Sequence, residues 1–128
     1  MLNILSIAIG GALGALCRVL AAAYIQQYTI GAFPAGTFAV NFIGAFLIGL
    51  FWGSFQLIPL PSHLSLFLIS GFLGALTTFS TYSLDTFQLL RSGAVRTALL
   101  NIAMSNVFGI LMVLCGYLLA CQAIQRLR

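Results

Sequence analysis

Charged side chains are almost absent from this chain of 128 residues. It has no lysine, no glutamate, one aspartate, one histidine and five arginines, and charged residues make up 5% of the sequence. An ordinary soluble domain has roughly 25% charged residues. Because 62% of this chain is hydrophobic, a water-soluble globule is excluded. A disordered chain is excluded as well, since disordered segments are poor in apolar residues. The composition predicts an integral membrane protein.

The groups that most enzymes use are also missing. The only acid is Asp85 and the only imidazole is His63, so no set of nucleophile, base and orienting group can be assembled. The three cysteines form no CxxC pair, and no cluster has enough ligands for a metal. The arginines are scattered and form no basic stripe along which phosphates would bind. We therefore expect neither an enzyme nor a nucleic-acid-binding protein.

Long apolar runs divide the chain into four predicted spans. They cover about residues 4–25, 36–57, 64–90 and 94–123 of a single transmembrane domain, 1–128. A helix needs about 20 residues to cross a bilayer, so four helices and short loops account for the whole length. Apolar runs of this length, without alternation, are typical of helices and not of a β-barrel. The predicted fold class is all-α, with both termini on the same side of the membrane.

Small residues recur at the spacing that lets transmembrane helices approach closely. Gly10 and Gly14 form one GxxxG step, and Gly49 and Gly53 form another. In lipid, close backbone approach rather than exclusion of water drives helix association. These glycines are predicted to pack helices and not to bind a ligand.

The most unusual segment is residues 77–83, which read TTFSTYS and begin at the centre of the third span. Unsatisfied polar groups in the hydrocarbon region of a bilayer are costly. One or two hydroxyls can bond to the preceding helical turn, but a segment this rich in them predicts a helix that is unwound at mid-membrane. Since unwound backbone at this depth coordinates ions in transporters, an ion or substrate site is favoured over simple helix packing.

Two other helices carry polar residues at comparable positions. Asn41 lies in the middle third of the second span, and Thr97, Asn101 and Ser105 recur every four residues along the fourth, with Asn106 beside that stripe. Such groups often join helices by hydrogen bonds. Three aligned polar positions facing the hydroxyl-rich segment favour a hydrated track instead. A lining of amide and hydroxyl donors without cations or carboxylates suits a small, strongly hydrated anion.

Phe79 and Tyr82 are three residues apart and share a helix face. The edge of an aromatic ring carries the positive part of its quadrupole. These edges can help to coordinate an anion without trapping it as an arginine would. Core packing is the alternative role, which the position of the pair inside the hydroxyl segment makes less favoured.

Three motifs resemble the Fluc/CrcB family of fluoride channels over essentially the whole chain. Residues 10–18 read GGALGALCR, like the family's GGxxGAxxR, and residues 36–44 read GTFAVNFIG, like GTxxxNxxG. Residues 71–83 read GFLGALTTFSTYS, which is similar to GxxGGxTTFSTFS. The third motif is the most specific of the three.

The resemblance implies a dual-topology, antiparallel homodimer of four-helix subunits with two narrow fluoride pores. It implies passive export of fluoride across the inner (plasma) membrane. It also implies that the protein contacts the lipid bilayer and binds a structural Na⁺ at the dimer centre. Backbone carbonyls of Gly74 and Thr77 would hold that cation. The residues that the resemblance assigns to the pore are Asn41, Phe79, Tyr82, Ser80, Thr81, Asn101, Ser105 and Arg18, the last at a vestibule.

The chain departs from the family pattern at three positions. Tyr82 stands where the family usually has phenylalanine, and its hydroxyl either donates to the anion or narrows the passage. Ala75 replaces the second glycine of the break, which affects the fine geometry there. Gly109 stands where some members continue the fourth-helix track with a serine, so it is left out of the predicted site.

Two other functions are compatible with parts of the sequence. A small multidrug-resistance-type exporter also has four helices and a similar length, but that family needs a glutamate in the first helix, and none is present. A membrane scaffold without transport activity explains the packing glycines but not the hydroxyl segment.

The arginines give almost no preference for one membrane orientation. With four spans, Arg91 and Arg96 lie on one side, to which Arg18 is nearest, and Arg126 and Arg128 lie on the other. Orientation is set mainly by the Lys/Arg bias of short loops, and three charges against two is a bias close to nil. The sequence therefore predicts insertion in both orientations, which is what antiparallel pairing needs.

Overall fold

The computed structural model describes residues 1–126, and the regular structure in that part of the chain is helical. Four segments are long and apolar enough to cross a membrane. Three of them are single helices, α1 (Leu2–Gln26), α2 (Ala35–Leu57) and α6 (Val95–Gln125), and the remaining crossing is Ser62–Arg91. The predicted spans are confirmed as helices, and every end lies within two residues of its expected position.

The third crossing is built from four pieces. It begins with α3 (Ser62–Ser65), continues as the π-helix η1 (Leu66–Leu73) and the short α4 (Gly74–Leu76), and resumes as α5 (Phe79–Arg91). Between α4 and α5, Thr77 and Thr78 are extended, with φ/ψ of −84°/153° and −149°/120°. The predicted interruption is thus present, but it is two residues long. Residues 79–83 already belong to α5, so the unwound stretch is confined to Thr77 and Thr78.

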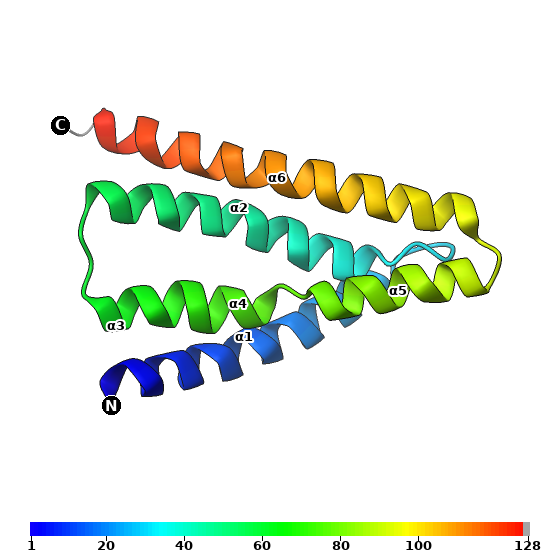
Figure 1. The fold of residues 1–128 in the computed structure, drawn as a ribbon, viewed down its shortest axis with the longest axis horizontal. Coiled ribbons are helices and arrows are strands. Elements are labelled where there is room, and N and C mark those ends of the chain that lie inside the picture. Colours follow the sequence, from blue (N-terminus) through cyan, green and yellow to red (C-terminus); the bar gives the residue numbers. More distant parts are fainter. Residues whose placement is uncertain (127–128) are drawn as a thin grey trace.

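The four crossings run up and down, as Figure 1 shows, so the N-terminus and the end of α6 lie at the same end of the molecule. The link between α2 and α3 is at that end too, and Pro59 and Pro61 in it keep α2 from continuing. The turns at the other end each contain a glycine with positive φ, Gly31 at 101° and Gly93 at 79°. Arg128, which enters the charge count, lies outside the described residues.

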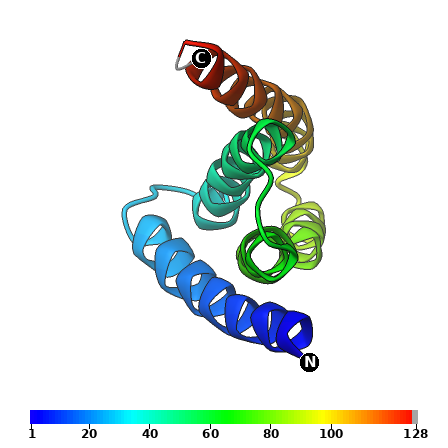
Figure 2. The same ribbon diagram turned by 90° about the vertical axis from the view of Figure 1, so that its left-hand side faces the viewer.

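Glycines let α1 pack closely against the first half of the third crossing and α2 against α6 (Figure 2). A Cβ at Gly10 or Gly14 of α1 would overlap the backbone carbonyl of Phe67 or Phe72. A Cβ at Gly49 of α2 would overlap the carbonyl of Val113. The predicted packing role of the GxxxG steps is therefore confirmed for these glycines.

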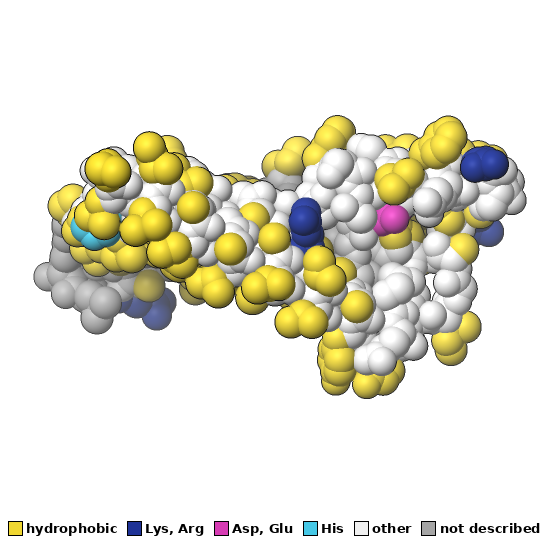
Figure 3. Space-filling model, turned by 90° about the horizontal axis from the view of Figure 1, so that it is seen from below, with side chains coloured by type: hydrophobic (Ala, Val, Ile, Leu, Met, Phe, Trp, Pro, Cys, Tyr) yellow, Lys and Arg dark blue, Asp and Glu magenta, His cyan; other side chains and the backbone are white. Residues whose placement is uncertain are grey.

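Large apolar side chains cover the outer surface of the bundle. Ile4, Leu20, Trp52 and Ile110 are all exposed in the single chain. Figure 3 shows hydrophobic side chains spread over one face, with few charged groups among them. Such a surface suits lipid or another apolar protein surface, and it agrees with a multi-pass membrane protein.

Candidate functional site

The break in the third crossing is fixed by the side chain of Thr78. Thr78 is the N-cap residue of α5, and its Oγ1 accepts a hydrogen bond from the backbone N–H of Thr81 at 3.1 Å. The same hydroxyl lies 3.2 Å from Ser80 Oγ and donates to Thr81 Oγ1 at 3.0 Å. A threonine with extended backbone is a favoured N-cap, so the hydroxyl segment both ends one helix and starts the next.

Asn41 of α2 holds the other side of the break. Its Nδ2 donates to the carbonyl oxygen of Thr78 at 3.1 Å, and its Oδ1 accepts from the backbone N–H of Thr78 at 2.7 Å. Thr78 is buried, so these two bonds satisfy backbone groups that helical bonding does not reach. The second proton of Nδ2 is unused in the described part of the chain. Asn41 is therefore a clamp on the break and still has a donor to offer.

The break also leaves backbone carbonyls without partners. The N–H of Thr77 bonds to Leu73, and the N–H of Thr78 bonds to the Asn41 side chain, so no described N–H reaches the carbonyls of Gly74 and Thr77. Gly74 is exposed, and a Cβ on it would meet only Ile69 O, at 3.6 Å. Two oxygen acceptors without a described backbone donor therefore lie near the middle of the crossing, and the space beside Gly74 is open.

A cavity of about 420 Å³, which we name the central groove, opens at this level between α2, the break and α6. Its lining contains no charged residue. Besides apolar residues and glycines, its side chains are those of Asn41, Thr77, Thr78, Phe79, Tyr82, Ser105 and Asn106. Amide and hydroxyl groups without a fixed charge can replace water around a small anion and still release it.

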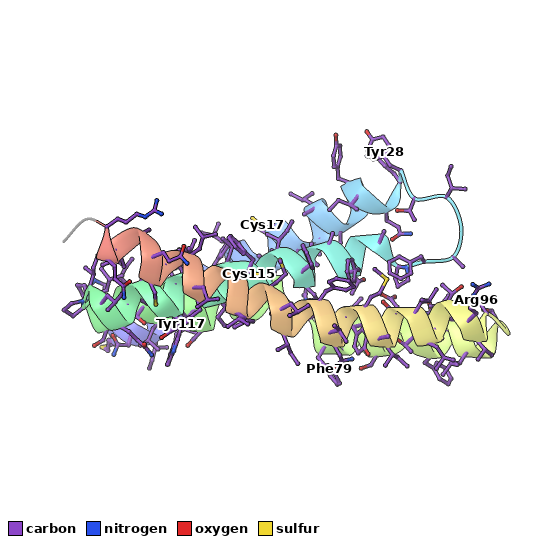
Figure 4. The ribbon with its side chains drawn as sticks, turned by 90° about the horizontal axis from the view of Figure 1, so that it is seen from above. Cys17, Tyr28, Phe79, Arg96, Cys115 and Tyr117 are labelled. Atoms are coloured by element: carbon purple, nitrogen blue, oxygen red, sulfur yellow. The ribbon has the colours of Figure 1, made fainter. Side chains whose placement is uncertain are left out.

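The two aromatic residues of the groove form a tilted pair. The ring centroids of Phe79 and Tyr82 are 5.6 Å apart, with an interplanar angle of 46°. Phe79 is 79% exposed, and Figure 4 shows it projecting outward from the bundle. This side chain is therefore free to contact lipid or another protein surface.

The fourth-helix track is divided between the groove and the protein interior. Asn101 is 1% exposed and is not in the groove lining; its Nδ2 donates to Thr86 Oγ1 at 2.9 Å. Thr86 in turn donates to the carbonyl of Tyr82 at 2.8 Å, and Ser105 lies 3.4 Å from Asn101 Oδ1. The structure therefore places Asn101 as a link between α5 and α6, and only Ser105 of the predicted stripe lines the groove.

Asn106 also lines the groove, although it is not among the predicted site residues, since it lies off the stripe of Thr97, Asn101 and Ser105. Its Nδ2 donates to the carbonyl of Ile102 at 2.8 Å and to the hydroxyl of Tyr82 at 3.3 Å. The signal that points to Asn106 is Tyr82 itself, since a phenol inside a membrane protein needs a polar neighbour.

The remaining predicted pore residues lie outside the lining of the central groove. Ser80 and Thr81 are exposed on the first turn of α5 and face away from the single chain's interior. Arg18 is half-buried on α1. Gly109, which is not among the predicted site residues, is in the lining.

A second cavity, of about 540 Å³, lies near the turns at the end opposite the termini. It contains Asp85, whose Oδ2 accepts a hydrogen bond from Thr37 Oγ1 at 2.6 Å. Gln26 ties the same region together, since its side chain bonds to the N–H of Gly36 and the carbonyl of Phe33. The only acid of the chain is thus held at a mouth of the bundle and away from the break.

The chain is similar in sequence to known proteins over most of its length. The model of the family described as "CrcB-like protein, Camphor Resistance (CrcB)" matches residues 5–117. A protein of Salinibacter ruber named fluoride-specific ion channel FluC is 43% identical over 116 residues, which are 91% of this chain and 87% of that protein. The protein of the same name from Parabacteroides distasonis is 35% identical over the full length of both chains. The one from Geobacter metallireducens is 47% identical over 82% of this chain and 86% of its own.

Proposed function

Because this chain belongs to the CrcB family, we propose that it is a fluoride-selective ion channel in the inner membrane, through which F⁻ leaves the cytoplasm passively. The family consists of ion channels, so the chain is not an enzyme, and it is not a multidrug-resistance-type exporter. HF crosses the bilayer, dissociates at cytoplasmic pH, and the resulting anion leaves through the channel. The observation that carries the proposal is a groove without charged residues, lined in part by amide and hydroxyl groups, at the break of a membrane-spanning helix.

The groups of the central groove suit both the binding of an anion and its release. The free amide proton of Asn41 replaces water around the anion, and the ring edges of Phe79 and Tyr82 add weak positive potential. A binding site that conducts must not hold its ion too tightly. The groove meets this condition because its lining residues include no arginine or lysine.

The single chain supplies only part of a pore, which supports a homodimer. Phe79 is 79% exposed, and Ser80, Thr81 and Ser83 are exposed near the middle of the crossing. Polar groups at that depth are tolerated where protein or water covers them and not where lipid does. A second copy in antiparallel orientation covers both breaks at the same depth and gives two equivalent pores.

The carbonyls of Gly74 and Thr77 fit a structural Na⁺ at the dimer centre. Both oxygens lack a described backbone donor, and the space beside Gly74 is open. The described residues contain no group of three His, Cys, Asp or Glu side chains for a metal, so the site has hard, uncharged oxygens, which suit a monovalent cation better than Ca²⁺ or Mg²⁺. One chain offers two such ligands, and two chains are needed for a full shell.

The cation is tested by exchanging it. Replacement of Na⁺ by N-methylglucamine in purified protein is expected to lower the thermal stability of the dimer and the fluoride flux together. The control replaces chloride by a larger anion at constant Na⁺. This exchange does not change the cation that the carbonyl site would bind. Unchanged stability and flux in N-methylglucamine would mean that no Na⁺ is needed.

The channel itself is tested by efflux from liposomes that contain the purified protein and are loaded with fluoride or chloride. We expect rapid fluoride efflux and chloride efflux at the level of empty liposomes. Equal rates for both anions, or no fluoride efflux, would contradict the proposal.

A further inference from the structure

We infer that Asn106 orients the hydroxyl of Tyr82 so that its proton points into the central groove and donates to fluoride. This inference rests on the proposed channel function. It assigns a direction to the hydroxyl of Tyr82, which stands where the family usually has phenylalanine. It also gives a role to Asn106, which belongs to none of the three motifs and lies off the polar stripe.

The hydrogen bonds of Asn106 determine which partner donates. Its amide nitrogen lies 2.8 Å from the carbonyl oxygen of Ile102, and a carbonyl accepts only from the NH₂ end of an amide. The same Nδ2 lies 3.3 Å from the Tyr82 oxygen. An amide nitrogen has two protons and no lone pair to offer, so the phenol oxygen is the acceptor in this contact.

The phenol proton must therefore point elsewhere. No described residue accepts a hydrogen bond from the Tyr82 hydroxyl, whose one recorded contact is the donor Asn106. Tyr82 and Asn106 both line the central groove, as do Asn41 and Ser105. A hydroxyl that already accepts one bond on the Asn106 side has its proton free for an anion in the groove.

The consequence is a stronger anion ligand than a ring edge. A hydrogen bond to a charged group contributes more than a neutral one, and polarisation by the Asn106 amide strengthens the phenol as a donor. The pair is thus expected to lower the fluoride concentration at which flux is half-saturated. Asn106 is a positioning residue, because it acts on the anion through Tyr82.

The experiment compares Tyr82→Phe, Asn106→Leu and the double variant in the liposome efflux assay. Tyr82→Phe removes only the hydroxyl, and the half-saturating fluoride concentration should rise about ten-fold. Asn106→Leu keeps the side-chain volume but frees the hydroxyl to rotate, so a smaller rise is expected. When Tyr82→Phe is already present, adding Asn106→Leu should change nothing further, because the group that Asn106 orients is gone. Tyr117→Phe, at a tyrosine of α6 outside the groove, is the matched control and should leave the concentration unchanged.

The outcomes separate this inference from the proposed function. Wild-type half-saturation in Tyr82→Phe would overturn the inference while the channel stands. Additive effects of the two substitutions would show that Asn106 does not act through Tyr82 and would also overturn it. No fluoride flux through the wild-type protein would overturn the channel itself, and the inference with it.

Discussion

Asn41 combines two roles that the sequence presents as one. Its central position in an apolar helix indicates a donor for an anion, and that prediction still awaits a test. The structure adds that both ends of its amide bond to the backbone of Thr78. The same side chain therefore sets the shape of the break and contributes a proton to the central groove.

Replacement of Asn41 should affect stability as well as flux. Asn41→Ala leaves the buried N–H of Thr78 without a partner, at a cost of about 1–3 kcal/mol in the free energy of unfolding. Flux should be lost. Thermal unfolding in detergent and liposome efflux measure the two effects. Ser54→Ala, which removes a hydroxyl that bonds back to Leu50 of the same helix, is the control. A variant with full stability but no flux would mean that the clamp is not needed to hold the break.

Residue type and periodicity predict part of the groove and miss the rest for a physical reason. Asn41, Phe79, Tyr82 and Ser105 are predicted to share a site, and all four line the same cavity. Asn101 instead donates a buried hydrogen bond to Thr86. A polar stripe on one helix can face two neighbouring helices, so its members contact different partners. Which member of a stripe faces which neighbour depends on helix crossing geometry, which one sequence does not reveal.

At the level of elements, the third crossing shows both what a sequence can predict and what it cannot. The hydroxyl content of residues 77–83 predicts the break, because a hydroxyl can replace a lost helical partner, as Thr78 does for Thr81. The π-helix η1 (Leu66–Leu73) was not predicted. Its residues are mostly apolar, so no periodic pattern distinguishes wide helical turns from ordinary ones.

The pairing of α1 with the third crossing depends on glycines and gives a direct prediction. In Gly14→Ala the added methyl group would overlap the carbonyl of Phe72, so the helices must separate and the protein should lose thermal stability by several degrees or fail to fold. Gly11→Ala, on the same helix, is the control because nothing lies within 4 Å of the added group. Equal melting temperatures of the two variants in detergent would contradict close packing at Gly14.

At the scale of the whole molecule, the distribution of arginines predicts the orientation in the membrane. Arg91 and Arg96 lie by the 92–94 turn, and Arg126 lies at the end of α6, at the opposite end of the bundle (Figure 1). With so small a difference the chain should insert both ways. A cysteine placed by Ser92→Cys, in a variant without Cys17, Cys115 and Cys121, should be labelled from outside intact cells in about half the molecules.

A matched reporter strengthens that experiment. A cysteine in the 59–61 link, at the other end of the bundle, should also be labelled in about half the molecules. Full labelling of one reporter and none of the other would mean a single orientation, and the antiparallel dimer would then be excluded.

An even number of crossings limits how this protein can be duplicated within one gene. Both ends of the described chain lie at the same end of the bundle (Figure 1). If two copies work only when one is inverted, the end of the first copy and the start of the second lie on opposite faces of the membrane. A soluble linker cannot join them. A tandem gene product therefore needs an additional membrane-spanning segment between its halves, whereas two separate chains need none.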